Sequence, residues 1–439
     1  MAAGFPPDDA GRGPGVPPEG PPRVPSSVLE TLSGRRIVLV VTGGVAAYKA
    51  AALARLLAKS GALVRTAMTE AGTRFVTPLT FEAVTGGECR VSMWDRDRFD
   101  IAHVSWAGWA ELALVAPATA DFLARAAAGL AGDFASSVIL ASRAPVVFCP
   151  AMNTGMLEHP ATRANLAILV ARAGATVMGS PEGPLACGTS GAGRMAEPRD
   201  IALQAARVLC RGALDGKRAL VTSGATVEPW DDVRVITNRS SGRMGAEIAR
   251  ACWVMGADVT LLSGPSAEDA GIASGDSFRQ ERVTDCRDLL ARVGAEAGAA
   301  DLLVMNAAPA DFRPSSAVAG KIRKAGGVPE LALVPNPDVL RSVGGLKKPG
   351  SVWVGFAAEP EDGAMASAMS KLRSKGLDLI AVNATSAFGG EVTGITLLDA
   401  GGGTALSVPD GSPKFAAAWL VVKAAAERLG KPGRPEEAP

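Results

Sequence analysis

Residues 36–57 read RIVLVVTGGVAAYKAAALARLL, and this stretch decides the fold of the first half of the chain. The apolar run at residues 36–41 is typical of a buried strand, the following Thr-Gly-Gly of a tight turn, and the run from Tyr48 of a helix. A helix that begins at the carboxyl end of a parallel strand offers free backbone N–H groups to a phosphate. The glycines do not form a Gly-x-Gly-x-x-Gly fingerprint, and an ordinary tight turn explains them equally well.

The same unit then repeats along the first half. Further strand-like runs occupy residues 63–69, 112–116 and 146–149, with helical patterns between them. Strands that alternate with helices predict a doubly wound parallel sheet, whose ligands lie at the carboxyl ends of the strands. The polar positions to examine are therefore those directly after each strand: Thr69, residues 117–121 and residues 150–156.

Cys187 lies in a run of small residues and glycines at positions 184–197. Such a run can fold over a ligand as a loop and present its thiol, because glycine reaches backbone conformations that other residues avoid. The alternative is a buried, unreactive cysteine next to a surface loop. The turn-forming residues on the carboxyl side of Cys187 favour the reactive thiol.

The composition excludes several classes of protein. The 439 residues carry a formal net charge of +1 and are 48% hydrophobic, which argues against a nucleic-acid binder and favours small-molecule substrates. Six cysteines without a Cys-x-x-Cys pair and only two histidines predict neither a zinc site nor disulfides, and hence a cytoplasmic protein. Residues 1–30, rich in proline and glycine, and residues 431–439 are expected to be disordered. Apolar runs of 18 residues are absent, so no membrane insertion is expected.

Four motifs of the first half together resemble the flavin-dependent phosphopantothenoylcysteine decarboxylases. They are His103 before Trp106, residues 116–121, residues 150–156 and residues 185–188, and the resemblance covers about residues 31–200. Leu157 departs from the family, in which tryptophan is frequent at this position.

The resemblance implies bound FMN, with its phosphate near Gly43, Gly44 and Thr69 and its ring near Ala118 and Thr119. A flavin supplies the electron sink that decarboxylation at an sp3 carbon needs and that amino-acid side chains lack.

The resemblance also implies three catalytic residues in this half. His103 is expected to be the base near the substrate thiol, Asn153 to hold the substrate carboxylate, and Cys187 to return a proton. From residue type alone, a structural histidine and an Asx-turn or cap are the alternatives for His103 and Asn153.

A new strand and glycine turn at residues 217–224 predict a second nucleotide-binding domain. The expected units are therefore residues 31–212 and 213–430. A polar loop at residues 237–245 precedes a helix expected over residues 246–255, and it suits either phosphate oxygens or an ordinary helix cap. Further strands are expected at residues 302–305 and 352–359, followed by a helix that carries Lys371 and Lys375 on one face.

These motifs resemble the phosphopantothenate-cysteine ligase half of the bacterial coenzyme A biosynthesis bifunctional proteins, over about residues 216–430. The resemblance implies that the carboxylate of 4'-phosphopantothenate attacks CTP to give an acyl-cytidylate, from which L-cysteine displaces CMP. Asn238 is expected to contact the acyl-cytidylate. The residues expected around CTP are Met305, Asn306, Ala307, Asp311, Lys321, Pro337, Asp338, Val339, Leu340, Phe356, Lys371 and Lys375.

Mg2+ is expected with the triphosphate, although the sequence identifies no metal ligands. The departures from this family are Pro309, Phe312 and Arg243, where valine, tyrosine and lysine are common.

The predicted fold is thus α/β, with two doubly wound Rossmann-like domains, the first a flavodoxin-like FMN-binding decarboxylase domain. The resemblance also implies a homo-oligomer. A nicotinamide-dependent reductase is disfavoured because neither half carries a dinucleotide fingerprint, and a flavoprotein regulatory subunit because it would need neither the cysteine loop nor the CTP half.

Overall fold

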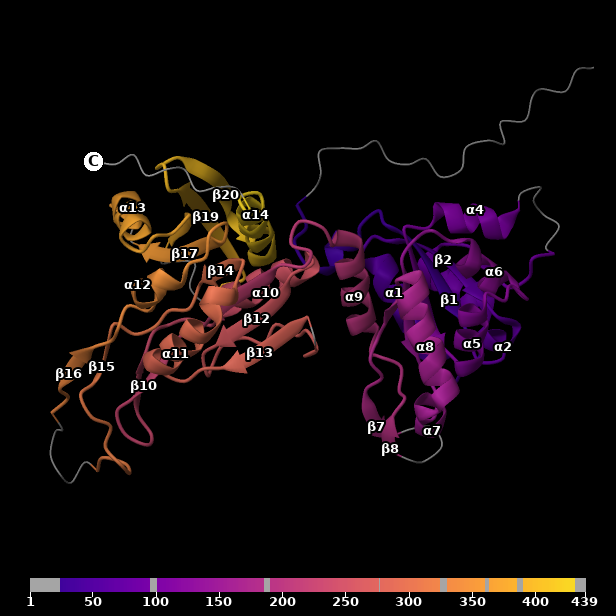
Figure 1. The fold of residues 1–439 in the computed structure, drawn as a ribbon, viewed down its shortest axis with the longest axis horizontal. Coiled ribbons are helices and arrows are strands. Elements are labelled where there is room, and N and C mark those ends of the chain that lie inside the picture. The colour runs from indigo at the N-terminus through magenta and orange to yellow at the C-terminus, as the bar shows by residue number, and fades with distance from the viewer. Residues whose placement is uncertain are drawn as a thin grey trace, which may run out of the picture.

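The computed structural model describes residues 24–94, 101–184, 190–275, 277–323, 330–359, 363–384 and 390–430. These residues form two lobes, each built on one large sheet (Figure 1).

The first lobe contains a parallel six-stranded sheet in the order β3-β2-β1-β4-β5-β6. Its strands are β1 (Arg36–Val41), β2 (Leu63–Met68), β3 (Cys89–Arg90), β4 (Leu112–Ala118), β5 (Val146–Pro150) and β6 (Thr176–Val177). The helices are α1 (Ala47–Lys59), α2 (Glu70–Thr73), α3 (Pro78–Thr85), α4 (Ala102–Trp109), α5 (Ala120–Ala128), α6 (Phe134–Ala141), α7 (Thr154–Glu158), α8 (Pro160–Ala173) and α9 (Pro198–Cys210). A hairpin of β7 (Glu182–Pro184) and β8 (Ser190–Ala192) precedes α9.

Helices cover both faces of this sheet because successive side chains of a strand point to opposite faces. Ile37 and Leu39 of β1 pack with the helices α1, α3 and α9, whereas Val38 and Val40 pack with α4, α5, α6 and α8. The strand order turns back between β1 and β4, and the gap at such a switch point is where doubly wound sheets bind ligands.

The second lobe repeats this order. Its sheet runs β13-β12-β9-β14-β17-β18 in parallel, and two antiparallel strands, β19 and β20, extend it. The strands are β9 (Arg218–Ser223), β12 (Asp258–Ser263), β13 (Phe278–Arg282), β14 (Leu302–Met305), β17 (Val352–Glu359), β18 (Leu379–Ala384), β19 (Val392–Asp399) and β20 (Thr404–Pro413). Two small hairpins, of β10 (Val227–Pro229) with β11 (Val235–Thr237) and of β15 (Phe312–Pro314) with β16 (Leu333–Pro335), project away from the large sheet (Figure 1).

The helices of the second lobe fall into two groups on the two faces of the sheet. One face packs α10 (Arg243–Val254) and α14 (Lys414–Ala426) against Val221, Val304 and Val354. The other face packs α11 (Cys286–Glu296), α12 (Val339–Val343) and α13 (Ala364–Ser374) against Leu220, Leu303 and Trp353.

Arg207 on α9 ties the two lobes together. Its guanidinium donates to the carbonyl oxygens of Trp253 in the last turn of α10, and of Gly256 at 3.1 Å and Ala257 at 2.9 Å just after this helix. The side chain is only 11% exposed, so it satisfies backbone groups that water hardly reaches.

The structure confirms the predicted strands of both halves and the α/β class. It corrects the start of α10, expected at residue 246, to Arg243. The reason is Gly242, whose φ of 70° is a left-handed conformation that lets the chain turn sharply and enter the helix three residues earlier.

Candidate active sites

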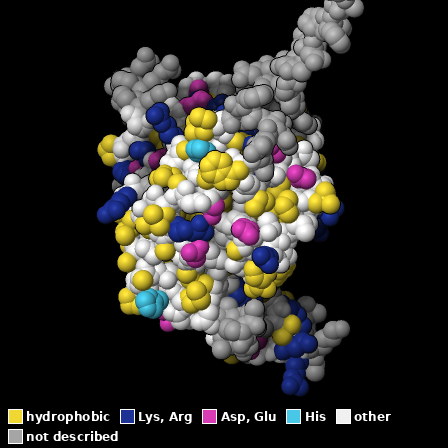
Figure 2. Space-filling view, turned by 90° about the vertical axis from the view of Figure 1, so that its right-hand side faces the viewer, with side chains coloured by type: hydrophobic (Ala, Val, Ile, Leu, Met, Phe, Trp, Pro, Cys, Tyr) yellow, Lys and Arg dark blue, Asp and Glu magenta, His cyan; other side chains and the backbone are white. Residues whose placement is uncertain are grey.

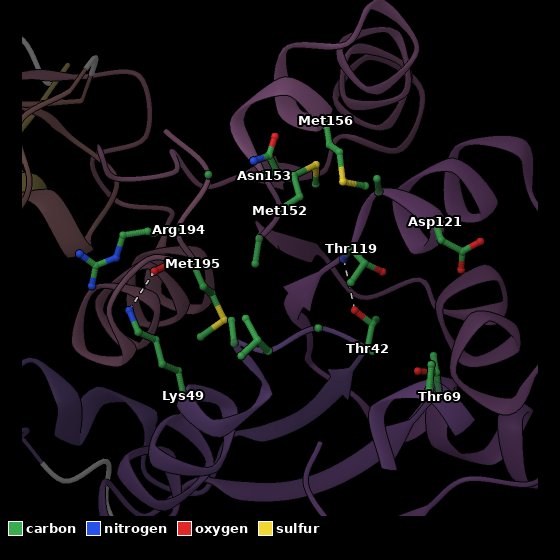
Figure 3. Close-up of a pocket in the computed structure, with 18 of the residues that line it drawn as sticks. Thr42, Lys49, Thr69, Thr119, Asp121, Met152, Asn153, Met156, Arg194 and Met195 are labelled. Atoms are coloured by element: carbon green, nitrogen blue, oxygen red, sulfur yellow. Dashed lines mark hydrogen bonds between the residues drawn. The ribbon is translucent and has the colours of Figure 1, made fainter. Parts of the chain in front are cut away.

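The first cavity, of about 870 Å³, lies at the switch point between β1 and β4 (Figure 3). It brings together four predicted residues, Gly43, Gly44, Thr69 and Thr119, with Asn153. Ala118 is fully buried at the end of β4 and is not among the described lining residues, so its neighbour Thr119 represents this strand in the cavity.

Thr42 connects the ends of two strands at the base of this cavity. It was not among the predicted site residues. Its hydroxyl donates to the carbonyl of Pro117 at 2.6 Å and accepts from the backbone N–H of Thr119 at 3.2 Å. One buried side chain thus fixes the ends of β1 and β4 relative to each other. The rule that polar residues after a strand line the ligand site would have found it, because Thr42 directly follows the β1 run.

Gly43 and Thr69 form the wall next to α2. A Cβ atom at Gly43 would lie 2.4 Å from the Cβ of Ala71, a distance that no side chain tolerates. Thr69 caps α2 by accepting from the N–H of Gly72 at 3.1 Å. Glycine is therefore required at position 43 because the turn after β1 packs directly against Ala71 of α2 at the wall of the cavity.

Asn153 is a helix cap, one of the two alternatives considered for it, and it also lines the cavity. Its Oδ1 accepts from the N–H of Gly155 at 2.8 Å, which makes it the N-cap of the short helix α7. The residue is exposed and lines the cavity, in which its side chain lies near Met152 and Met156 (Figure 3).

Lys49 anchors the segment that follows β8. The buried side chain reaches from α1 to the carbonyl of Met195 at 3.3 Å and to Oε1 of Glu197 at 2.7 Å (Figure 3). Thr154 adds a bond of 2.6 Å to the carbonyl of Ala192. The segment on the carboxyl-terminal side of the cysteine loop is therefore tied to the rim of the cavity, while Cys187 itself lies outside the described residues.

The structure does not bring His103 to this cavity. His103 lies half-buried on α4 and is not among the described lining residues. Cys149, at the end of β5, is fully buried, and burial raises the pKa of its thiol far above neutrality. This thiol therefore stays protonated and is no nucleophile.

The second cavity, of about 550 Å³, lies at the corresponding switch point between β9 and β14. It brings together every residue predicted for the CTP site except Lys321, and it adds Asn238. Lys321 is exposed beside the Asp231 loop, to which the N–H of Ile322 donates at 3.1 Å. Hence Lys321 is not among the described residues around this cavity.

Threonines fix the strand ends here as Thr42 does in the first lobe. Thr222 accepts from the N–H of Ala307 at 3.0 Å, and Thr226 accepts from the N–H of Ala310 at 3.1 Å. Thr226 in turn donates to Glu228 at 3.0 Å, a carboxylate that is only 1% exposed and also accepts from the N–H of Cys286. The loop after β14 is therefore held rigidly, including the segment around Pro309.

Asn238 also contacts the loop after β14. Its Nδ2 donates to the carbonyl oxygens of Ala308 at 3.3 Å and of Pro309 at 3.0 Å, although the residue is exposed. The proline at position 309 costs no hydrogen bond of this set because only its carbonyl is used.

Lys375 is directed to the turn at the start of α12. Its ammonium group lies 2.9 Å from Oδ2 of Asp338, whose Oδ1 accepts from the N–H of Arg341 at 3.2 Å and so caps α12. Of the three lysines expected around CTP, Lys371 and Lys375 line the cavity, whereas Lys321 is not among its lining residues.

Three cations in the lining were not predicted as site residues: Arg239 in the loop before α10, Arg243 at the start of α10 and Lys414 at the start of α14. None of them lies directly after a strand of the parallel sheet, so the search for polar residues after such strands could not find them.

Within the described residues, no group of three or more histidine, cysteine or acidic side chains is arranged to hold a metal ion. None of the described helices is long and apolar enough to span a bilayer.

Two protein-family models match this chain and define the class of protein to which it belongs. Residues 25–209 match the flavoprotein family model, and residues 214–428 match the model of the DNA/pantothenate metabolism flavoprotein C-terminal domain. The chain is thus a flavoprotein with an attached pantothenate-metabolism domain.

Full-length relatives define the family. The coenzyme A biosynthesis bifunctional protein CoaBC of Vibrio cholerae is 40% identical over 364 residues, which cover 82% of this chain and 90% of that protein. The CoaBC protein of Mycobacterium tuberculosis is 42% identical over 364 residues, which cover 80% of this chain and 86% of that protein. The chain therefore belongs to the family of coenzyme A biosynthesis bifunctional proteins.

Among solved structures, the chain is similar to the C-terminal domain of a coenzyme A biosynthesis bifunctional protein CoaBC, at 30% identity. The match has a TM-score of 0.41 and covers 49% of this chain and 96% of that domain. It is also similar to a PPC decarboxylase mutant complexed with pantothenoylaminoethenethiol, at 28% identity. That match has a TM-score of 0.37 and covers 39% of this chain and 96% of that protein.

Family membership confirms the predicted enzyme class and function. The chain is a bifunctional enzyme of coenzyme A biosynthesis that combines cysteine ligation with FMN-dependent decarboxylation.

Proposed function

We propose that the two cavities divide the two reactions between them. The first, within residues 31–212, decarboxylates 4'-phosphopantothenoylcysteine, and the second, within residues 213–430, makes this compound from 4'-phosphopantothenate, L-cysteine and CTP. The observation that supports this division is that each lobe has its own cavity at the switch point of its own sheet.

The residues of the first cavity fit FMN. Gly43 and Gly44 form the turn before α1, Thr69 caps α2, and all three residues line the cavity. FMN, when bound, supplies the electron sink by accepting and returning a hydride at the thiol-bearing carbon. The chain's part is to hold the phosphate near Gly43, Gly44 and Thr69, to orient the substrate carboxylate at Asn153, and to return a proton from Cys187.

His103 completes this site from a second protomer in our proposal. It is not among the described lining residues of its own cavity, and α4 and its flanks carry exposed hydrophobic side chains: Trp94, Ile101 and Val104. The face of the first lobe shown in Figure 2 carries hydrophobic side chains over much of its surface. Such a surface suits contact with another copy of the chain, in keeping with the expected homo-oligomer.

In the second cavity, Phe356, the loop after β14 and the turn from Pro337 to Leu340 surround the cytosine and ribose of CTP. Asn238 lies beside the α-phosphorus and orients the attacking carboxylate. Mg2+ enters with the triphosphate, because the described residues provide no cage of their own for it. The acyl-cytidylate is needed because a carboxylate is a poor electrophile toward an amine at neutral pH.

All substrates and products are small polar molecules, and we propose that both reactions take place in the cytoplasm. The test is to supply the purified chain with 4'-phosphopantothenate and L-cysteine, with either CTP or ATP, and to follow pyrophosphate and CO2 separately. Release of both with CTP supports the proposal. Failure to release pyrophosphate with either nucleotide would exclude the ligase assignment, and CO2 release without bound flavin would exclude the role of FMN.

A further inference from the structure

The ligase cavity holds more positive charge than the proposed function uses. Arg243 and Lys414 line it from α10 and α14, which cover one face of the sheet, and Arg239 lines it from the loop before α10. Lys371 on α13 and Lys375 directly after α13 lie on the opposite side. The cavity therefore has two cationic sides, separated by the ends of β9, β14 and β17.

Both sides carry cations that are paired with carboxylates of the chain. Lys375 pairs with Asp338 of the turn at the start of α12. On the other side, Arg243 lies 2.8 Å from Glu268 and 3.8 Å from Glu391. Only this second side also has the positive end of a helix dipole, that of α10, a helix of 12 residues.

Lys414 is the unusual member of this second side. It is 7% exposed, yet it contributes to the cavity wall. Burial and the neighbouring charge of Arg243 lower the pKa of its ammonium group, while Glu268 and Glu247 act in the opposite direction. Lys414 has partners within the chain, and an anion between its ammonium group and the Arg243 guanidinium would be attracted by both charges.

The arrangement of the cavity indicates which anion would lie between Lys414 and Arg243. If the cytosine and ribose lie against the Pro337 turn and Phe356, the α-phosphorus comes next to Asn238, and the remaining phosphates continue toward the start of α10. There the buried ammonium and the guanidinium converge. The triphosphate of CTP carries more negative charge than the single phosphate of 4'-phosphopantothenate. Its β- and γ-phosphates leave together as pyrophosphate.

We propose that Lys414 binds the β- and γ-phosphates of CTP and stabilises the departing pyrophosphate. In this step a carboxylate oxygen forms a bond to the α-phosphorus, and the bond from that phosphorus to the bridging oxygen breaks. The bridging oxygen leaves with the electron pair as part of pyrophosphate. Lys414 donates hydrogen bonds to the leaving group and keeps its proton. This assignment rests on the proposed ligase function of the cavity.

The test compares CTP with CMP on the full-length chain, because only CTP carries the phosphates in question. Lys414→Met keeps most of the apolar stem and removes the charge. We expect it to weaken CTP binding about 10- to 100-fold, the range for loss of a charged hydrogen-bonding group, and to change CMP binding less than about threefold. Lys414→Arg should restore part of the difference.

Lys423→Met is the matched control, since Lys423 is an exposed lysine on the same helix. Retained CMP binding reports whether the ligase lobe of each variant folds, and CO2 release from supplied 4'-phosphopantothenoylcysteine reports the state of the other lobe. Equal loss of CTP and CMP affinity in Lys414→Met, or no loss of either, would overturn the role of Lys414. A wild-type chain that binds no nucleoside triphosphate would instead refute the ligase function itself.

Discussion

Asn238→Asp separates the two activities most cleanly. The substitution replaces an amide that donates to the carbonyl oxygens of Ala308 and Pro309, at 3.3 and 3.0 Å, with a carboxylate that repels both. Loss of two exposed hydrogen bonds costs about 1–3 kcal/mol of loop stability, and water replaces part of this.

The new charge has the larger effect. Two unit charges about 4 Å apart interact by about 4 kcal/mol at the effective dielectric of a protein surface. The carboxylate introduced at position 238 would repel the attacking carboxylate and the α-phosphate by this order. We therefore expect ligation to fall by about 1,000-fold.

The assay measures pyrophosphate release from CTP and 4'-phosphopantothenate, and CO2 release from supplied 4'-phosphopantothenoylcysteine, in the same preparation. CO2 release should stay within about twofold of the wild type because the other lobe performs it. Asn238→Ala removes the amide without adding charge and should lose only about 10- to 100-fold in ligation. Unchanged ligation in Asn238→Asp would remove this residue from the site.

Three further predictions address the fold and the flavin site. Gly43→Ala places a Cβ 2.4 Å from that of Ala71 and should yield a protein that purifies without flavin absorbance; Gly294→Ala, with nothing within 4 Å, should stay yellow. Arg207→Met removes a donor from three carbonyls, of which, among the described residues, only that of Trp253 keeps a backbone donor, the N–H of Gly256, and should destabilise the contact between the lobes by about 2–4 kcal/mol, seen as a lower melting temperature with both activities reduced together. Burial raises the pKa of the Asp133 carboxyl, but hydrogen bonds from Ser136 and the charge of Arg125 outweigh this and hold the pKa below its ordinary value. Its stabilising effect is therefore present above the unfolded pKa and lost as pH falls through the folded pKa, so the difference in melting temperature between wild type and Asp133→Asn should vanish at acid pH. A difference that persists there would contradict the assignment.

The strand patterns and the residues directly after them could be predicted because both follow local rules. Buried parallel strands are continuous apolar runs, and ligands bind at their carboxyl ends. Gly43, Thr69 and Asn306 could therefore be predicted as cavity residues from the sequence.

The residues that were missed depend on contacts between distant segments. Lys414 follows an antiparallel strand and reaches the cavity only because α14 packs beside α10, and Arg207 bonds to carbonyls about 50 positions away. The prediction that Lys321 lies near CTP also depended on distant contacts. Its charge suggested a phosphate partner, but the loop that carries it lies beside the Asp231 segment. Neither the local sequence pattern nor the charge of a residue shows which distant segments it will contact.

The most direct test of the central claim follows one batch of the full-length chain through both reactions. The chain is supplied with 4'-phosphopantothenate, CTP and L-cysteine labelled in its carboxyl group, and pyrophosphate and labelled CO2 are measured over time. We expect a yellow protein that releases equal amounts of the two, with CO2 following pyrophosphate after a lag. A colourless protein that does not take up FMN, or CO2 released from cysteine without pyrophosphate, would contradict the assignment of one reaction to each lobe.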